Sequence, residues 1–178
     1  MGNNYFLAIR GKWLRSGKES VIVNIYGPYS DSGKKELWKL LEDTISSVDT
    51  ACLLCGDFNK VRTHSDRLNF IFNKTRAKRF NEFIARNNLV EIPINGRRYT
   101  RISDGRKFSK LDSFLANDKF LNLWEDLSIV ALDRKELDHC LLVLRDKLVD
   151  FGPKPFKIFN EWVTREGVVE QPQSKKGV

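Results

Sequence analysis

The sequence lacks any apolar run close to the roughly 20 residues that a helix needs to cross a bilayer. Its N-terminus also lacks the basic segment, long apolar stretch and small-residue cleavage site of a secretory signal. Cysteine is scarce, with 3 residues in a chain of 178, which is too few for the disulfide scaffold of a small secreted domain. We therefore expect an intracellular protein, nuclear or cytoplasmic, with reduced thiols and no membrane partner.

Two of the cysteines, Cys52 and Cys55, have the C-x-x-C spacing of metal and redox sites. No second pair of ligands follows them, and residues three apart on a strand point to opposite faces. We interpret both as thiols of the hydrophobic core, with metal storage or redox work as the alternative.

The composition is that of a globular domain, with 41% hydrophobic and 30% charged residues. The length is sufficient for one domain with one core. Lys and Arg exceed Asp and Glu by 31 to 23, which gives a formal net charge of +8. Such a charge favours anionic partners such as nucleic acid, although many basic surfaces serve only solubility.

The segment at residues 51–59, with the sequence ACLLCGDFN, organises the rest of the chain. Its five apolar residues predict a strand that is buried on both faces, and the glycine marks the point where the chain leaves the sheet. Asp57 and Asn59 therefore lie at the C-terminal end of a strand, where α/β sheets bind ligands. A carboxylate and a carboxamide at this spacing can hold a water molecule and a phosphate oxygen.

Other strands and helices follow from the apolar periodicity and the turn residues. Strands are predicted at residues 5–9, 20–26, 89–94, 98–102, 107–115, 127–132 and 140–144. Helices are predicted from a cap at Asp31 or Ser32 through residue 48, at residues 75–87, and from a cap at Asn117 through residue 124.

The connections predict a layered α/β fold, because strand 20–26, the first helix and strand 51–55 form a crossover unit. Asn95-Gly96 and Asp104-Gly105 are the dipeptides best suited to tight hairpins. Residues 60–73 show no period and are predicted to form a long surface loop.

Several polar residues lie at the ends of predicted strands, or within a strand that points toward one. They are Tyr26, Asp57, Asn59, Asp112, Asp138 and His139. Phosphodiester hydrolysis needs a divalent ion, a group that orients water, and donors for the phosphate oxygens, and these residue types can supply that set.

Basic residues on the second helix and in the turn after residue 96 are candidates for contacts with nucleic acid. They are Arg76, Lys78, Arg79, Arg97 and Arg98. The alternative is that they form a solvated surface with no partner. If they gather on one face, binding to DNA should weaken steeply as salt rises.

The order of these motifs resembles the endonuclease/exonuclease/phosphatase superfamily, and within it the endonuclease domain of plant non-LTR (LINE-type) retroelements. The resemblance extends over residues 5–162 and rests on VNIYGP at 23–28, CGDFN at 55–59, SKLDSFL at 109–115 and LDHC at 137–140. It implies an α/β fold of the deoxyribonuclease type, an αββα four-layer sandwich, at residues 1–149. Residues 150–178 resemble the linker toward a reverse transcriptase.

The resemblance also implies a function and a role for each candidate residue. The function is Mg²⁺-dependent nicking of DNA without a small-molecule cofactor. In that reaction Tyr26 contacts the phosphate and Asn59 holds it. Asp57 orients the attacking water, and Asp138 lies near the metal. His139 pairs with Asp112 and acts as base or transition-state stabiliser.

Departures from the family pattern lead to a second hypothesis, an inactive retroelement relic that retains at most nucleic-acid binding. Nothing before residue 5 supplies the opening strands, one of which carries a metal-binding glutamate, so we expect a sandwich without them. Arg101, Ser113 and Leu137 replace the usual tryptophan, arginine and serine. We therefore expect weak or absent Mg²⁺ binding and slow nicking.

Overall fold

The computed structural model describes residues 2, 4–14, 17–124, 126–134 and 137–146, with only the backbone of residue 146. These residues belong to a compact unit that spans Met1–Leu148. The predicted linker at residues 150–178 lies outside the described residues. No helix in the described part is long and apolar enough to cross a membrane.

Strands outnumber helices along the described chain. The helices are α1 (Asp31–Ser47), α2 (Lys74–Arg86) and α3 (Asp118–Leu121), with a single 3-10 turn, η1 (His64–Asp66). The strands are β1 (Phe6–Lys12), β2 (Glu19–Tyr26), β3 (Ala51–Asp57), β4 (Arg67–Leu68), β5 (Val90–Glu91), β6 (Ile94–Asn95), β7 (Arg101–Ser103), β8 (Lys107–Ser109), β9 (Asp112–Ala116), β10 (Leu127–Ala131) and β11 (Leu142–Asp146).

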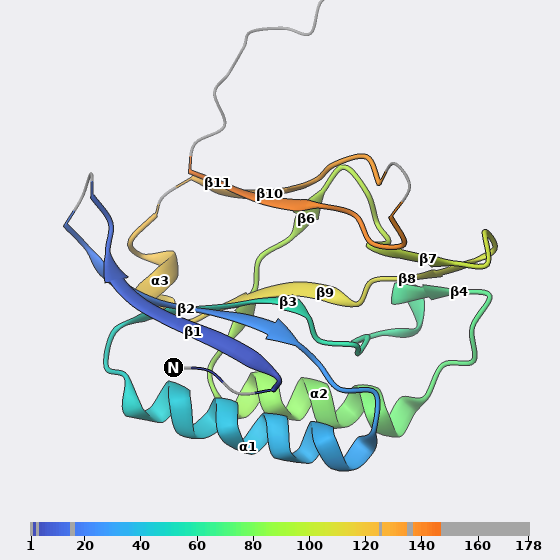
Figure 1. Ribbon diagram of the computed structural model, residues 1–178, viewed down its shortest axis with the longest axis horizontal. Coiled ribbons are helices and arrows are strands. Elements are labelled where there is room, and N and C mark those ends of the chain that lie inside the picture. Colours follow the sequence, from blue (N-terminus) through green and yellow to red (C-terminus); the bar gives the residue numbers. More distant parts are fainter. Residues whose placement is uncertain (1, 3, 15–16, 125, 135–136, 147–178) are drawn as a thin grey trace, which may run out of the picture. The chain divides into compact units, whose positions relative to one another are not determined.

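The strands form a five-stranded sheet in the order β1-β2-β3-β9-β5 and two three-stranded sheets, β11-β10-β6 and β4-β8-β7. Helices α1 and α2 lie along one face of the large sheet, and the sheet β11-β10-β6 lies on its other side (Figure 1). The sheet β4-β8-β7 lies beyond the end of β9 in this view. β2 and β3 are parallel, as the predicted crossover through α1 requires. The predicted layered α/β class is confirmed.

Strand β3 has a hydrophobic cluster on each face. In the cluster under the helices, the ring of Trp38 stacks on Phe80 and Phe83, with centroids 5.3 and 4.7 Å apart. Because successive residues of a strand point to opposite faces, Cys52 enters this cluster and Leu53 enters the other. The apolar run therefore forms the buried central strand that the sequence predicts.

The start of α1 differs from the prediction by one residue. Ser30, rather than Asp31 or Ser32, is the N-cap, and its hydroxyl oxygen accepts the backbone N–H of Gly33 at 3.1 Å. This places the first turn of α1 directly after the end of β2 and close to the loop that follows β3.

Of the two predicted hairpins, one is confirmed and one is wrong. Asp104 and Gly105 join β7 to β8 and have the positive φ angles, 51° and 64°, of a tight hairpin turn. No hairpin forms at Asn95-Gly96, because β6 pairs with β10 whereas β7 pairs with β8. Each flanking strand thus has a partner in a different sheet.

Three further predictions need correction. The single strand predicted at residues 89–94 is divided into β5, in the large sheet, and β6, which pairs with β10. The single strand predicted at residues 107–115 is divided at Lys110 and Leu111 into β8 and β9, which belong to different sheets. The loop predicted at residues 60–73 contains η1 and the two-residue strand β4, which pairs with β8. Such a short strand has no period of its own and exists because β8 lies beside it.

We expect the Leu41→Ala substitution to lower the free energy of unfolding by about 2–5 kcal/mol, because Leu41 is fully buried and its truncation leaves a cavity. Leu14→Ala is the matched control, since the side chain of Leu14 is 103% exposed. It should change stability by less than about 0.5 kcal/mol. Urea unfolding measures both, and equal losses would contradict the assigned core.

Candidate active site

Three neighbouring strands bring three of the predicted residues to one rim of the large sheet. Tyr26 of β2 pairs with Asp57 of β3, and Asp57 pairs with Asp112 of β9. Gly56, just before Asp57, has a φ of 117°, and a Cβ atom there would lie 2.3 Å from the carbonyl oxygen of Ile25. Only glycine fits this close approach, so Gly56 lets β3 carry Asp57 to the rim.

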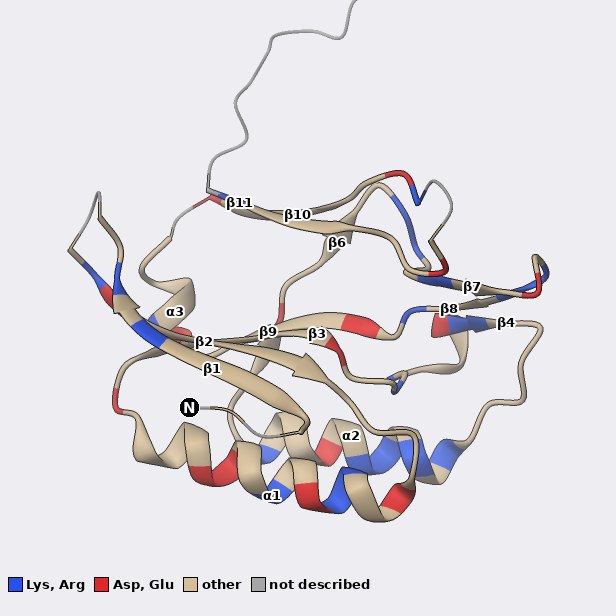
Figure 2. Ribbon diagram, viewed as in Figure 1, with Lys and Arg blue, Asp and Glu red and all other residues tan. Residues whose placement is uncertain are grey.

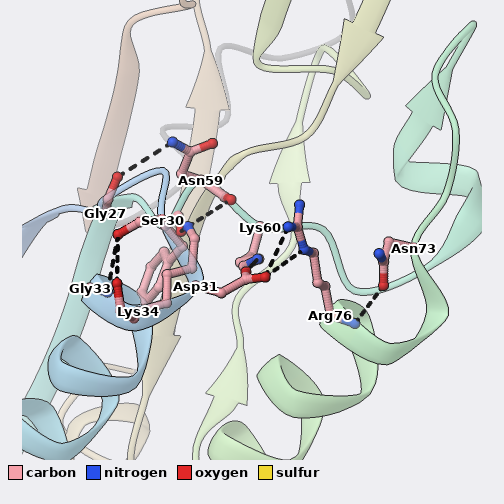
Figure 3. A network of polar contacts seen from close by, with 11 residues as sticks. Gly27, Ser30, Asp31, Gly33, Lys34, Asn59, Lys60, Asn73 and Arg76 are labelled. Carbon is pink, nitrogen blue, oxygen red and sulfur yellow. Dashed lines mark hydrogen bonds and ion pairs between the residues drawn. The ribbon is translucent and has the colours of Figure 1, made fainter.

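The loop after β3 fixes the orientation of the Asp57 carboxylate. The backbone N–H of Asn59 donates to Asp57 Oδ1 at 2.6 Å. Asn59 has a φ of 51°, a conformation that asparagine adopts more readily than most residues. Its side-chain amide donates to the carbonyl oxygen of Gly27 at 3.4 Å, so the carboxamide lies beside the end of β2 (Figure 3).

Lys34 of α1 holds the same loop from the helix layer. Its ammonium group donates to the carbonyl oxygens of Phe58, at 3.0 Å, and of Asn59, at 2.8 Å (Figure 3). Lys34 is only 3% exposed, and burial, together with the charge of nearby Lys60, lowers its pKa to about 7. Lys34 is not among the site residues predicted from the sequence, although its spacing from Leu37 places it on the buried face of the helix.

His139 lies within hydrogen-bond reach of Asp112, as predicted, with Nδ1 2.9 Å from Oδ2. Thr100 positions both partners. Its hydroxyl oxygen accepts the backbone N–H of Asp112 at 3.2 Å, and its carbonyl oxygen accepts that of Cys140 at 2.7 Å. Thr100 is fully buried, and nothing in the sequence distinguished it from other threonines.

Asp57, His139 and Asp112 form a row of ionisable groups, which we call the rim triad. Nε2 of His139 lies 3.9 Å from Asp57 Oδ2, so the ring stands between the two carboxylates. The hydrogen bond with Asp112, and then the charges of both carboxylates, raise the pKa of His139. Burial, and then the charge of Asp112, raise the pKa of Asp57. The ring therefore stays protonated to higher pH than a free histidine.

Two of the predicted residues lie beside the rim triad without joining it. The side chain of Asp138 is 64% exposed and forms an ion pair with Arg101 at 3.4 Å. Tyr26 is also largely exposed. Arg101 is one of the departures from the family pattern, and its charge occupies the carboxylate that was predicted to lie near a metal.

The five basic residues predicted to contact nucleic acid form two groups rather than one face. Arg76, Lys78 and Arg79 lie on α2, whereas Arg97 and Arg98 lie between β6 and β7, on the other side of the large sheet (Figure 2). Acidic neighbours pair with three of them, in the ion pairs Arg76–Asp31, Lys78–Glu82 and Arg97–Asp133. The excess positive charge is therefore partly compensated at these positions.

Among the residues that the structure describes, no three His, Cys, Asp or Glu side chains gather in a way that could hold a metal ion. Burial raises the pKa of Cys52 and that of Cys55 to about 11, which leaves almost no thiolate at neutral pH. This favours the interpretation of both thiols as core residues.

Sequence comparison gives one family. A family model described as "Endonuclease-reverse transcriptase" matches residues 20–139, more than half of the 178 residues. No curated protein sequence matches the chain.

Solved structures of two endonucleases and of a 3′ phosphatase share the fold. The endonuclease domain of TRAS1, a telomere-specific non-LTR retrotransposon, is 16% identical with a TM-score of 0.56, over 82% of this chain and 65% of that one. An AP endonuclease from Archaeoglobus fulgidus is 20% identical with a TM-score of 0.54, over 79% and 65%. The 3′ phosphatase NExo from Neisseria, bound to a product DNA hairpin, is 14% identical with a TM-score of 0.55, over 72% and 62%. The chain thus spans less than two thirds of each of these structures, and such identities establish the fold alone.

We expect Lys34 to make the fold more stable as the pH rises from about 7 to about 9. Its folded pKa of about 7 lies below the ordinary value of 10.5, so over this range the unfolded chain binds more protons than the folded one. The free energy of unfolding should gain about 2 kcal/mol from this group, and the Lys34→Met variant should lack the gain. Urea unfolding of both proteins at the two pH values tests this, and an equal gain in both would contradict it.

Replacing Asp112 with asparagine should lower the pKa of His139, because the variant loses the carboxylate whose hydrogen bond and charge raise it. NMR titration of the imidazole resonances measures the change. Asp133→Asn makes the same chemical change at an exposed carboxylate and should leave the titration of His139 unaltered. An unaltered titration in Asp112→Asn would show that the two side chains do not interact in solution.

Proposed function

Because this chain belongs to the endonuclease-reverse transcriptase family, we propose that it is the nuclease domain of a retroelement of the plant LINE type and that it nicks DNA. The observation that carries the proposal is the rim triad, in which His139 lies 2.9 Å from Asp112 and 3.9 Å from Asp57. In this proposal residues 1–149 form the nuclease domain, and residues 150–178 lead toward a reverse transcriptase. The protein would act on DNA inside the cell, in the nucleus or the cytoplasm.

In the proposed reaction His139 supplies positive charge to the phosphate. Asp112 fixes the ring through Nδ1 and leaves Nε2 on the side of Asp57. The raised pKa of His139 favours the protonated ring, whose Nε2–H can donate to an oxygen that gains negative charge in the transition state. This supports the role of transition-state stabiliser over that of general base, which needs a neutral imidazole.

Asp57 orients the attacking water in this proposal. The N–H of Asn59 holds one of its oxygens, Oδ1, while Oδ2 faces His139 and can accept a proton from a water molecule. The Asn59 amide, whose bond to Gly27 is long at 3.4 Å, and the exposed hydroxyl of Tyr26 would hold the phosphate oxygens.

A divalent ion, Mg²⁺ in our proposal, would neutralise negative charge on the leaving oxygen when bound. The described residues do not fit such an ion by themselves, because they contain no group of three suitable side chains and Asp138 is paired with Arg101. Mg²⁺ keeps its waters unless carboxylates position it. We therefore propose that this chain binds Mg²⁺ weakly and uses no small-molecule cofactor.

The lack of metal ligands also favours a second candidate function. This candidate is an inactive retroelement copy that retains nucleic-acid binding. Two of the departures from the family pattern are engaged in contacts away from the rim triad. Arg101 pairs with Asp138, and the hydroxyl of Ser113 donates to Glu91 at 3.1 Å. Neither side chain is free to contact a phosphate without losing that contact.

Nicking of supercoiled plasmid in Mg²⁺ separates the two candidates. We expect slow nicking by the parent protein and a further loss of about 10²–10³-fold in His139→Ala, because that variant lacks one strong electrostatic stabiliser. His64→Ala is the matched control, since His64 is the only other histidine of the chain, and its ring packs on Phe72 in the described structure.

The control variant should nick at the parental rate. Nicking that persists in His139→Ala would refute the rim triad as the site, whereas a parent protein that never nicks at any Mg²⁺ concentration would favour the inactive copy.

A further inference from the structure

A basic cavity of about 420 Å³ lies beside the loop that carries Asn59, and none of the roles above uses it. It is lined by the first turn of α2, the loop after β3 and the sheet β4-β8-β7. Four cationic side chains line it, namely Lys60, Arg67, Arg76 and Arg101, and the described lining residues include no Asp or Glu. Asn59 also lines it, so the cavity borders the proposed phosphate site.

The positive charge of this cavity is only partly compensated. Lys60 and Arg76 share the single carboxylate of Asp31, at 3.5 and 2.9 Å, and both point toward it in Figure 3. Arg67 forms no ion pair within the described part of the chain, and its guanidinium lies over the ring of Phe70 at 5.1 Å. The cavity thus contains more cations than the neighbouring acids can neutralise.

One buried donor of the cavity lacks any acceptor. The Nε atom of Arg67 is inaccessible to solvent and has no hydrogen-bond partner within the described structure, whereas that of Arg101 lies 3.4 Å from Asp138 Oδ2 in the ion pair described above. An unpaired buried donor costs free energy, and a guanidinium is suited to the paired oxygens of a phosphate or carboxylate. An anion in the cavity would remove this cost.

Repulsion among the cations of the cavity also favours a bound anion. Burial lowers the pKa of Lys60, and the charges of Arg76 and Arg67 lower it further although Asp31 opposes them. Burial, and then the charge of Arg76, also lower the pKa of Arg67. The cations therefore destabilise one another in the free protein, and a bound anion would relieve the repulsion.

We propose that this cavity binds a phosphate group, with Arg67 and Lys60 as its ligands. The next step rests on the proposed function, in which Asn59 holds the phosphate that is cut. Because Asn59 also lines the cavity, the phosphate in the cavity is the neighbour of that phosphate along the strand. The cavity then fixes the register of the strand in the site. A free mononucleotide carries the same chemistry, and the experiment distinguishes the two sources.

The test measures binding without added metal, so that no substrate is consumed. Fluorescence anisotropy measures the binding of a short labelled DNA duplex. Calorimetry measures the binding of thymidine 5′-monophosphate and of inorganic phosphate. The test variant is Arg67→Gln. The matched control is Arg86→Gln, which makes the same change in charge on α2, at an exposed residue paired with Glu42 at 2.8 Å.

We expect Arg67→Gln to weaken DNA binding by about tenfold and to reduce the salt slope by about one, as the loss of one phosphate contact requires. Arg86→Gln should change the affinity by less than about twofold. Circular dichroism verifies that each variant is folded. Should Arg67→Gln fail to fold, Lys60→Gln tests the same site.

Each outcome decides the inference. Equal losses in Arg67→Gln and Arg86→Gln, or no binding of any of the three ligands by the parent protein, would overturn it. Arg67-dependent binding of thymidine monophosphate without DNA binding supports the phosphate site and overturns its assignment to a strand. Arg67-dependent DNA binding without nicking supports the cavity while the proposed hydrolysis fails.

Discussion

The site depends on a histidine that stands between two largely buried carboxylates. The register of the large sheet places Asp57 opposite Asp112, and like charges at paired positions of a ladder repel each other. His139 lies 3.9 Å from one carboxylate and 2.9 Å from the other, so a proton on its ring offsets the charge of both. The pKa of His139 is raised by these same carboxylates, beginning with its hydrogen bond to Asp112. Stability and the proposed chemistry thus rely on the same three groups.

Two buried polar residues, Lys34 and Thr100, hold this arrangement through hydrogen bonds to the backbone. Lys34 attaches the loop after β3 to the helix layer, through the carbonyl oxygens of Phe58 and Asn59. Thr100 attaches the start of β9 to the segment that carries His139. Buried polar groups of this kind must be satisfied, and here they are satisfied by the backbone of the site itself. Each one couples the position of a proposed catalytic residue to the packing of a layer.

The distribution of charge matters more than its sum. The formal net charge of +8 predicts an anionic partner but does not say where that partner binds. Ion pairs engage most of the basic residues singled out from the sequence. The cavity beside Asn59 is lined by four cations, whose ion-pair partners in the described structure are two carboxylates, Asp31 and Asp138. Cations therefore gather beside Asn59, where we propose that a phosphate binds.

The sequence by itself determined the features that depend on local periodicity and turn chemistry. These are the central strand β3, helices α1 and α2, and the hairpin at Asp104-Gly105, while the motif order indicated the pairing of Asp112 with His139. Only the tertiary structure decided which strands pair, and so it divided residues 107–115 between two sheets and created β4.

The tertiary structure also decided the surroundings of the site, including the pairing of Asp138 with Arg101. The ammonium of Lys34 reaches a carbonyl 25 residues away in the chain, and the hydroxyl of Thr100 reaches a backbone N–H 12 residues away. Contacts at such separations leave no local period or turn signal. They form only when the packed layers bring the two segments together.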